Sequence, residues 1–215
     1  MIEPKIDLDN LRAVIFDLDG TLLDSYPVHF QAYRFTFSRF GIDLTEEDFL
    51  ATYSPNWFDT YRALGLPQEK WEEADTYWLE AASRLAPELF PGVLETLQRL
   101  RRSFRLGLVT SGSKERVFSD LGERDLQSFF ETIVTGDDVQ NPKPAPDGLL
   151  QALEAMRLTA GEAVYVGDSG LDWEMSTNAG VPFVGIQSRF ASLDPGIPYR
   201  QVTAISDLPA LLMAE

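Results

Sequence analysis

Two aspartates one residue apart, Asp17 and Asp19, stand in the segment "VIFDLDGTLLDS", directly after an apolar run. Two carboxylates this close repel each other, and burial strengthens the repulsion. Two more carboxylates, Asp168 and Asp172, follow a second apolar run in "AVYVGDSGLD". A hard divalent cation would offset their charge if folding brings them together. Oxygen ligands suit Mg²⁺, which keeps few protein ligands and leaves positions for a substrate phosphate.

Donors for a phosphate stand after two other apolar runs. "RLGLVTSGS" supplies the hydroxyl of Thr110 and, through Ser111 and Gly112, backbone N–H groups at the start of a predicted helix. "NPKPAPD" supplies the ammonium of Lys143 between two prolines, which restrict its backbone. Taken singly, these segments also suit a turn, a helix N-cap or a solvated loop. Their shared place after successive apolar runs favours one common site.

The elements that must position these side chains follow an alternating pattern. Amphipathic helices are predicted over 93–102 and 148–158, where apolar residues share one face. Nearly continuous apolar runs predict β-strands that are buried on both faces, at residues 12–19, 105–111, 131–136, 163–169 and 182–187. The alternation predicts an α/β fold with a Rossmann-like parallel sheet and helices on both faces. Loops at the carboxyl ends of such strands bind ligands.

Residues 25–90 interrupt the alternation. This stretch has no convincing strand and carries aromatic residues at helical spacing, which predicts several helices packed around an aromatic core. The turn in "ELFPGV" then returns the chain to the alternating pattern. We therefore expect a catalytic core made of residues 1–24 and 91–215, with residues 25–90 inserted as a helical cap domain.

Composition narrows the classes of partner. The 215 residues carry a formal net charge of -16, which argues against binding to nucleic acid or to an anionic membrane surface. The absence of cysteine excludes disulfides, thiolate zinc sites and a cysteine nucleophile. We expect a soluble cytoplasmic protein, a monomer or homodimer, that acts on a small phosphorylated metabolite.

Four of these segments, in order, resemble the motifs of the haloacid dehalogenase-like superfamily. "DLDGT" resembles its first motif, Thr110 its second, Lys143 its third and "GDSGLD" its fourth. The insert after the first motif and the "FPGV" at its exit are similar to the phosphoglycolate phosphatase and beta-phosphoglucomutase branch. The resemblance covers most of the chain, and it implies phosphoryl transfer without specifying a substrate.

The resemblance also implies a role for each motif residue. Asp17 would attack phosphorus and form an aspartyl phosphate, and Asp19 would act as general acid and then as general base. Thr110 and Lys143 would stabilise the transferring phosphoryl group. The metal ligands would be Asp17, Asp19 and Asp168, with Asp172 orienting ligands or a metal-bound water from outside. Phosphate or substrate would contact Gly20, Thr110, Ser111, Gly112, Lys143 and His29.

His29 suits two roles, because a lone histidine among aromatic residues can be packed in a core as well as handle a proton near neutral pH. The dehalogenase branch is disfavoured because Asp19 is present. The phosphonate-cleaving branch is disfavoured because Lys70, the one lysine of the predicted cap, does not stand in its motif. A sugar phosphomutase is disfavoured because "YSPNW" (residues 53–57) has no arginine to hold a second phosphate.

The sequence therefore favours a Mg²⁺-dependent phosphatase of small phosphomonoesters, with phosphoglycolate or a sugar phosphate as substrate. The alternatives are a sugar phosphomutase, a pyrophosphatase, and a non-catalytic binding protein on the same fold. Intact Asp17, Asp19, Lys143 and Asp168 argue against the last of these.

Overall fold

The computed structural model describes residues 6–54, 57–188 and 199–213. It divides into two compact units, one made of residues 1–23 and 89–215 and the other of residues 24–88. The chain passes from one unit to the other through β2 (Leu23–Asp24) and returns through β3 (Glu88–Leu89), and these two strands pair with each other. That the smaller unit acts as a cap stays a prediction.

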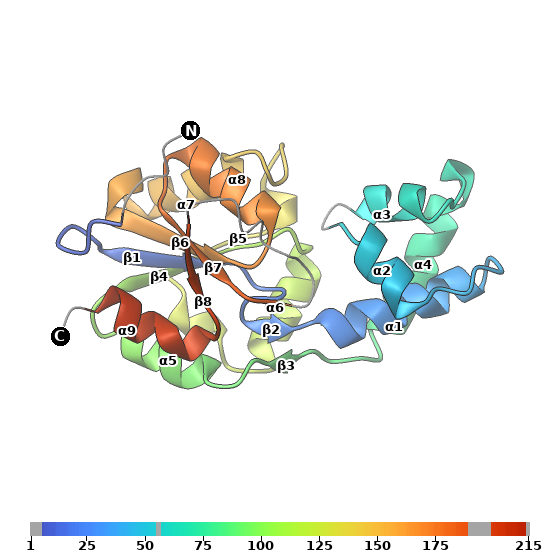
Figure 1. The fold of residues 1–215 in the computed structure, drawn as a ribbon, viewed down its shortest axis with the longest axis horizontal. Coiled ribbons are helices and arrows are strands. Elements are labelled where there is room, and N and C mark those ends of the chain that lie inside the picture. The colour runs from blue at the N-terminus through green and yellow to red at the C-terminus, as the bar shows by residue number, and fades with distance from the viewer. Residues whose placement is uncertain (1–5, 55–56, 189–198, 214–215) are drawn as a thin grey trace. The chain divides into compact units, whose positions relative to one another are not determined.

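The larger unit is built on a parallel sheet of six strands in the order β5-β4-β1-β6-β7-β8 (Figure 1). The strands are β1 (Ala13–Phe16), β4 (Arg105–Val109), β5 (Thr132–Val134), β6 (Ala163–Gly167), β7 (Phe183–Ile186) and β8 (Arg200–Val202). The α/β fold class is thereby confirmed. The sequence analysis missed only the edge strand β8, because a short strand with two exposed polar residues lacks the apolar run of a buried strand.

Helices cover both faces of this sheet (Figure 1). They are α5 (Val93–Leu100), α6 (Lys114–Gly122), α7 (Asp147–Met156), α8 (Gly170–Ala179) and α9 (Leu208–Leu212). Successive residues of β1 point to opposite faces, as strand geometry requires. Val14 and Phe16 join an apolar core with α5, α6 and α9, whereas Ala13 and Ile15 join a second core with α7 and α8.

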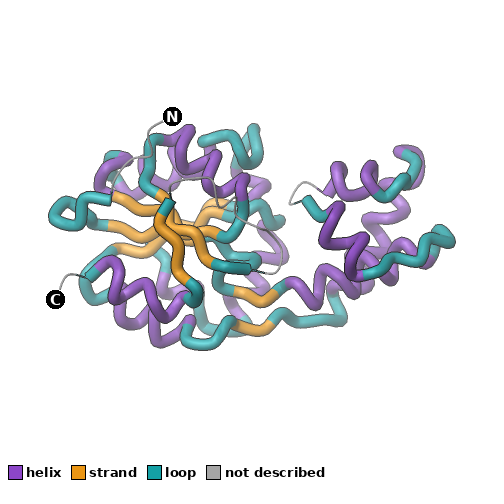
Figure 2. Tube along the Cα trace, in the orientation of Figure 1, coloured by secondary structure: helices purple, strands orange, loops and turns teal. Residues whose placement is uncertain are grey.

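The strand ends place the polar motifs. β1 lies between β4 and β6, with Ala13 in register with both Arg105 and Ala163. The N–H of Asp17 still donates to the carbonyl of Val166 at 2.8 Å, so the first residue after β1 remains bonded to the sheet. Figure 2 shows the strands running side by side, so that their following loops emerge at one edge.

The smaller unit is helical. It contains α1 (Tyr26–Ser38), α2 (Glu46–Thr52), α3 (Trp57–Ala63), a 3-10 turn η1 (Gln68–Lys70) and α4 (Trp71–Ala82). Its core is aromatic, with Tyr33, Phe37, Phe49 and Tyr61 buried, and the ring of Tyr33 meets the other three. None of the helices in the described part of the chain has the length and hydrophobicity that a membrane span requires.

Candidate active site

Three buried carboxylates meet at the carboxyl edge of the sheet. Asp17 follows β1, Asp168 follows β6, and Asp172 lies in the first turn of α8. One carboxylate oxygen of each lies within 4.8 Å of the others. The amino end of α8 fixes Asp172, since Ser169 caps the helix by accepting the N–H of Asp172 while its own N–H and hydroxyl donate to the Asp172 side chain.

Lys143 is the cation of this cluster. Its Nζ donates to Oδ1 of Asp17 at 2.6 Å, to Oδ1 of Asp172 at 2.7 Å and to the hydroxyl of Tyr165 at 2.8 Å. The lysine side chain is only 8% exposed, so these bonds are formed largely out of water. The Tyr165 hydroxyl donates onward to the carbonyl of Val109 at the end of β4. One ammonium therefore faces three carboxylates, and the cluster keeps an excess of negative charge.

The pKa shifts of the four charged groups show which carboxylates carry the excess negative charge. Burial raises the pKa of Asp17 to about 7, against the opposing effect of Lys143. Burial, together with Asp172 and Asp17, raises the pKa of Asp168 well above its usual range. Burial alone would lower the pKa of Lys143, but the two carboxylates that it contacts raise it instead. Lys143 and Ser169 lower the pKa of Asp172 despite its burial. Asp17 and Asp168 are therefore the groups that lack sufficient positive charge.

A divalent cation fits this set of donors. Oδ2 of Asp168 is buried and has no hydrogen-bond partner among the described residues. A buried carboxylate oxygen without a partner is costly, and oxygen-ligated metals are a common way to satisfy one. The site thus has three carboxylates close to one another, a buried Asp168 oxygen without a hydrogen bond, and more negative than positive charge.

Gly20 gives Asp168 the room it occupies. The glycine has a φ of +77°, and a Cβ built on it would lie 2.2 Å from Oδ2 of Asp168. Its N–H donates to the carbonyl of Leu23 at 2.9 Å, which closes the turn after β1. The geometry therefore gives Gly20 a role in shaping the turn, while its predicted contact with phosphate stays a prediction.

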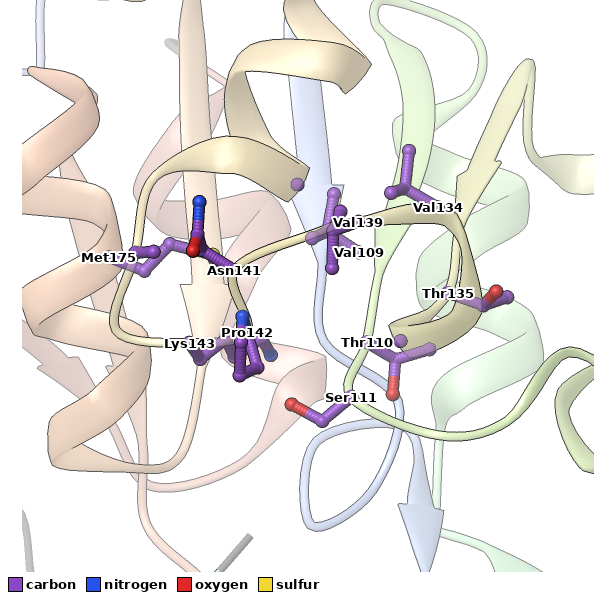
Figure 3. Close-up of a pocket in the computed structure, with 13 residues that line it drawn as sticks. Val109, Thr110, Ser111, Val134, Thr135, Val139, Asn141, Pro142, Lys143 and Met175 are labelled. Atoms are coloured by element: carbon purple, nitrogen blue, oxygen red, sulfur yellow. The ribbon is translucent and has the colours of Figure 1, made fainter. Parts of the chain in front are cut away.

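Two of the other predicted phosphate-binding residues line a cavity together with Lys143. Thr110, Ser111 and Lys143 line one small cavity, and Figure 3 shows the loop of Pro142 and Lys143 alongside the segment that carries Thr110 and Ser111. Thr110 Oγ1 accepts the N–H of Gly112 at 3.3 Å, and the carbonyl of Gly112 accepts the N–H of Gly136 at 2.9 Å. Hydrogen bonds within and between loops thus hold this segment in place.

Asp19 is not among the three carboxylates that lie within 4.8 Å of one another, and its predicted role as a metal ligand stays a prediction. Its carboxylate bonds to Arg116 of α6, with Nη1 of Arg116 3.1 Å from Oδ1. β1 ends at Phe16 and the chain turns at Gly20, so the two-residue alternation of a strand does not extend to Asp19. Asp172 is one of those three carboxylates. Its oxygens accept hydrogen bonds from Lys143 and Ser169, and its predicted role outside the metal ligands stays a prediction.

Sequence reasoning also missed two residues of the site. Tyr165 was part of a predicted buried strand, although a tyrosine within a buried run needs a partner for its hydroxyl. Arg116 gave a weaker signal, which is its four-residue spacing to Asp120 on a helix. Nothing in the sequence connects Arg116 to Asp19, 97 positions away.

His29 belongs to the smaller unit, where its ring meets the rings of Tyr53 and Trp78 edge-on. Its predicted contact with substrate stays a prediction. In the segment "YSPNW", the N–H of Ser54 donates to Oγ1 of Thr60 at 2.8 Å, and residues 55–56 lie outside the described residues.

Comparison with known proteins places the chain in a family. The model of the haloacid dehalogenase-like hydrolases matches residues 14–186. The chain is 32% identical to pyrophosphatase PpaX of Bacillus pumilus over 95% of this chain and 98% of that protein. It is 31% identical to the phosphoglycolate phosphatase of Salmonella typhi over 93% of this chain and 88% of that protein.

Among solved structures, a subfamily IA hydrolase of Geobacter sulfurreducens superposes with a TM-score of 0.71 at 29% identity, covering 94% of this chain and 97% of that one. The match to the family model spans the segments that carry Asp17, Lys143 and Asp168. The chain therefore belongs to the haloacid dehalogenase-like hydrolases, in the branch that includes the phosphoglycolate phosphatases.

Proposed function

We propose that this protein is a Mg²⁺-dependent phosphatase that hydrolyses a small phosphomonoester, such as phosphoglycolate or a sugar phosphate, through an aspartyl phosphate. The proposal rests on the surroundings of the Asp17 carboxylate. One of its oxygens is held by Lys143 in a buried cluster that also contains the orphaned oxygen of Asp168. A carboxylate that is held in place beside a site for positive charge is suited to attack the phosphorus of a phosphate ester.

The chain's own residues divide the reaction between them. Asp17 attacks phosphorus, and the bond from phosphorus to the leaving oxygen breaks as the aspartyl phosphate forms. Asp19 gives its proton to the leaving oxygen. In the second step a water attacks the same phosphorus, Asp19 takes its proton, and the bond to Asp17 breaks, which releases phosphate and restores the carboxylate.

Positive charge around the phosphoryl group supports both steps. Lys143 and the hydroxyl of Thr110 bind the phosphoryl oxygens from the cavity that they share. Asp17, Asp168 and Asp172 would hold Mg²⁺, which when bound supplies neutralising charge for the phosphate. Pyrophosphate is a second candidate substrate, favoured by the 32% identity to a protein named as a pyrophosphatase.

A substrate panel tests the proposal. Metal-stripped protein is assayed for phosphate release from phosphoglycolate, several sugar phosphates, pyrophosphate and an aryl phosphate, with chelator and then with Mg²⁺. We expect release only with Mg²⁺, and none from the Asp17→Asn variant. Asp9→Asn, which makes the same change at an exposed position, is the matched control. Full activity in chelator, or in Asp17→Asn, would contradict the proposal.

A further inference from the structure

Arg116, which lies in α6, binds the carboxylate of Asp19 in the loop after β1. Its Nη1 and Nη2 donate to Oδ1 and Oδ2 of Asp19, one nitrogen to each oxygen. This fork geometry fixes the plane of a carboxylate as well as its position, which a single ammonium cannot do. The two side chains are 25% and 18% exposed, so the pair is largely screened from water.

The guanidinium of Arg116 is itself held from behind. Nη1 also donates to Oδ2 of Asp120 at 3.3 Å, one helical turn further along α6. Arg124, two residues beyond the end of α6, donates to the carbonyl oxygen of Asp120 at 2.7 Å and to its Oδ1 at 3.4 Å. The four residues form a chain of alternating charges, which we call the Arg116 network. A guanidinium anchored in this way restricts the carboxylate that it grips.

A glycine makes room for this arrangement beside the phosphate-binding segment. A Cβ built on Gly112 would lie 2.3 Å from Nη2 of Arg116 and 2.9 Å from Cγ2 of Val117. The guanidinium therefore occupies the space that a side chain at position 112 would fill. The same guanidinium thus lies beside Gly112 and bonds to Asp19.

We propose that Arg116 is a positioning residue for Asp19, which it holds in the orientation needed to exchange a proton with the leaving oxygen and then with water. The inference rests on the proposed function, because it assigns Arg116 a task within that reaction. A surface ion pair is the plainer account of such a contact. The forked geometry, the partial burial and the anchoring through Asp120 and Arg124 go beyond what such a pair requires.

The first test compares Arg116→Gln with wild type on an alkyl phosphate and on an activated aryl phosphate. A misplacement of about 1 Å can cost on the order of 10²-fold in rate, so we expect kcat on the alkyl phosphate to fall about 10- to 100-fold. KM should change much less, and the aryl phosphate should lose less because its leaving group needs little protonation. Arg116→Lys should recover part of kcat. Arg102→Gln, the same change at an exposed site, is the control.

A double-mutant cycle then separates positioning from general support of the fold. If Arg116 acts through Asp19, adding Arg116→Gln to Asp19→Asn should have almost no further effect on kcat. An equal loss in both backgrounds would overturn the inference, as would wild-type kcat in Arg116→Gln alone. Thermal unfolding of each variant identifies a folding defect, and Arg116→Lys takes the place of Arg116→Gln in the cycle if the latter is unfolded at the assay temperature.

A crystal structure of the Arg116→Gln or Arg116→Lys variant tests the inference without turnover. We expect the Asp19 side chain to adopt a different or a divided orientation, whereas the orientation seen here would overturn the inference. If wild type releases no phosphate from any substrate, the proposed function fails, and this structural comparison still judges the positioning of Asp19 by itself.

Discussion

Two clusters of acidic and basic side chains in the larger unit differ in their balance of charge. At the Lys143 centre one ammonium faces three buried carboxylates, and a carboxylate oxygen is left without a partner. In the Arg116 network two guanidinium groups alternate with two carboxylates along one helix and one loop. The first group is short of positive charge and is therefore suited to a cation and a phosphate. The second is neutralised internally and is suited to holding a side chain still.

The comparison assigns different consequences to the two aspartates of "DLD". Asp17 belongs to the group that is short of charge, and Asp19 belongs to the group that is neutralised. Substitutions in either cluster test this difference, and the largest loss of activity should come from Asp17 and the smallest from a displaced Arg116 guanidinium.

The largest effect should follow from removing the nucleophile. Asp17→Asn should lower turnover by about 10⁴-fold or more and leave no covalent phosphate on the chain. Asp19→Asn should lose about 10²–10⁴-fold, the usual range for general acid–base assistance, and should accumulate phosphoenzyme from an aryl phosphate. Rapid-quench labelling with a phosphorus-32 substrate distinguishes them. Label trapped in Asp17→Asn but never in Asp19→Asn would show that the two roles are reversed.

The next largest effect should be on the stabilisation of the fold by a metal ion at Asp168. A metal that binds only the folded chain should stabilise wild type by about 2.7 kcal/mol at 100 times its dissociation constant, and Asp168→Asn should lose most of this shift. Thermal unfolding with increasing Mg²⁺ measures it. An undiminished shift in the variant would show that the metal binds elsewhere.

The same variant should behave in the opposite way in chelator. The pKa of Asp168 is raised in the folded chain, so an unfolded chain releases this proton first and folding loses stability as pH rises above about 4. Asp168→Asn removes that loss and should be more stable than wild type near neutral pH without metal. Denaturant unfolding at several pH values checks this, and a variant that is less stable at every pH would argue against charge strain.

A smaller effect is expected at the turn after β1. Gly20→Ala places a side chain at positive φ and against Oδ2 of Asp168, and it should destabilise the chain by about 1–3 kcal/mol. It should also weaken the Mg²⁺ shift because Asp168 must move. Gly161→Ala is the matched control, since its Cβ would have no neighbour within 4 Å. Equal unfolding midpoints for the two variants would show that the turn tolerates a side chain.

The smallest effect should come from Gly112→Ala. Its Cβ would press on the guanidinium end of Arg116, which is a flexible group, so we expect kcat to fall several-fold, or about 1 kcal/mol in activation free energy. Gly122→Ala, whose Cβ would meet no neighbour within 4 Å, is the control, at the end of the helix that carries Arg116. If Gly112→Ala loses activity equally in wild type and in Arg116→Gln, its effect does not pass through the guanidinium.

The sequence predicted the Lys143 centre better than the Arg116 network for a physical reason. Asp17, Asp168 and Lys143 each follow an apolar run, and parallel strands bring their carboxyl ends to one edge. The orientation of Asp19 depends on a turn and on a helix partner 97 residues away, and neither leaves a periodic pattern. β8 was missed for a related reason, because an edge strand need not be apolar.

The pairing of β2 with β3 has a consequence for how this chain can change. The chain leaves the larger unit at Leu23 and re-enters it at Leu89, on strands that lie next to each other. A segment whose two ends are neighbours can be lengthened, shortened or exchanged at little cost in loop closure. The helices of residues 24–88 can therefore be changed while the sheet, and with it the position of Asp17, stays the same.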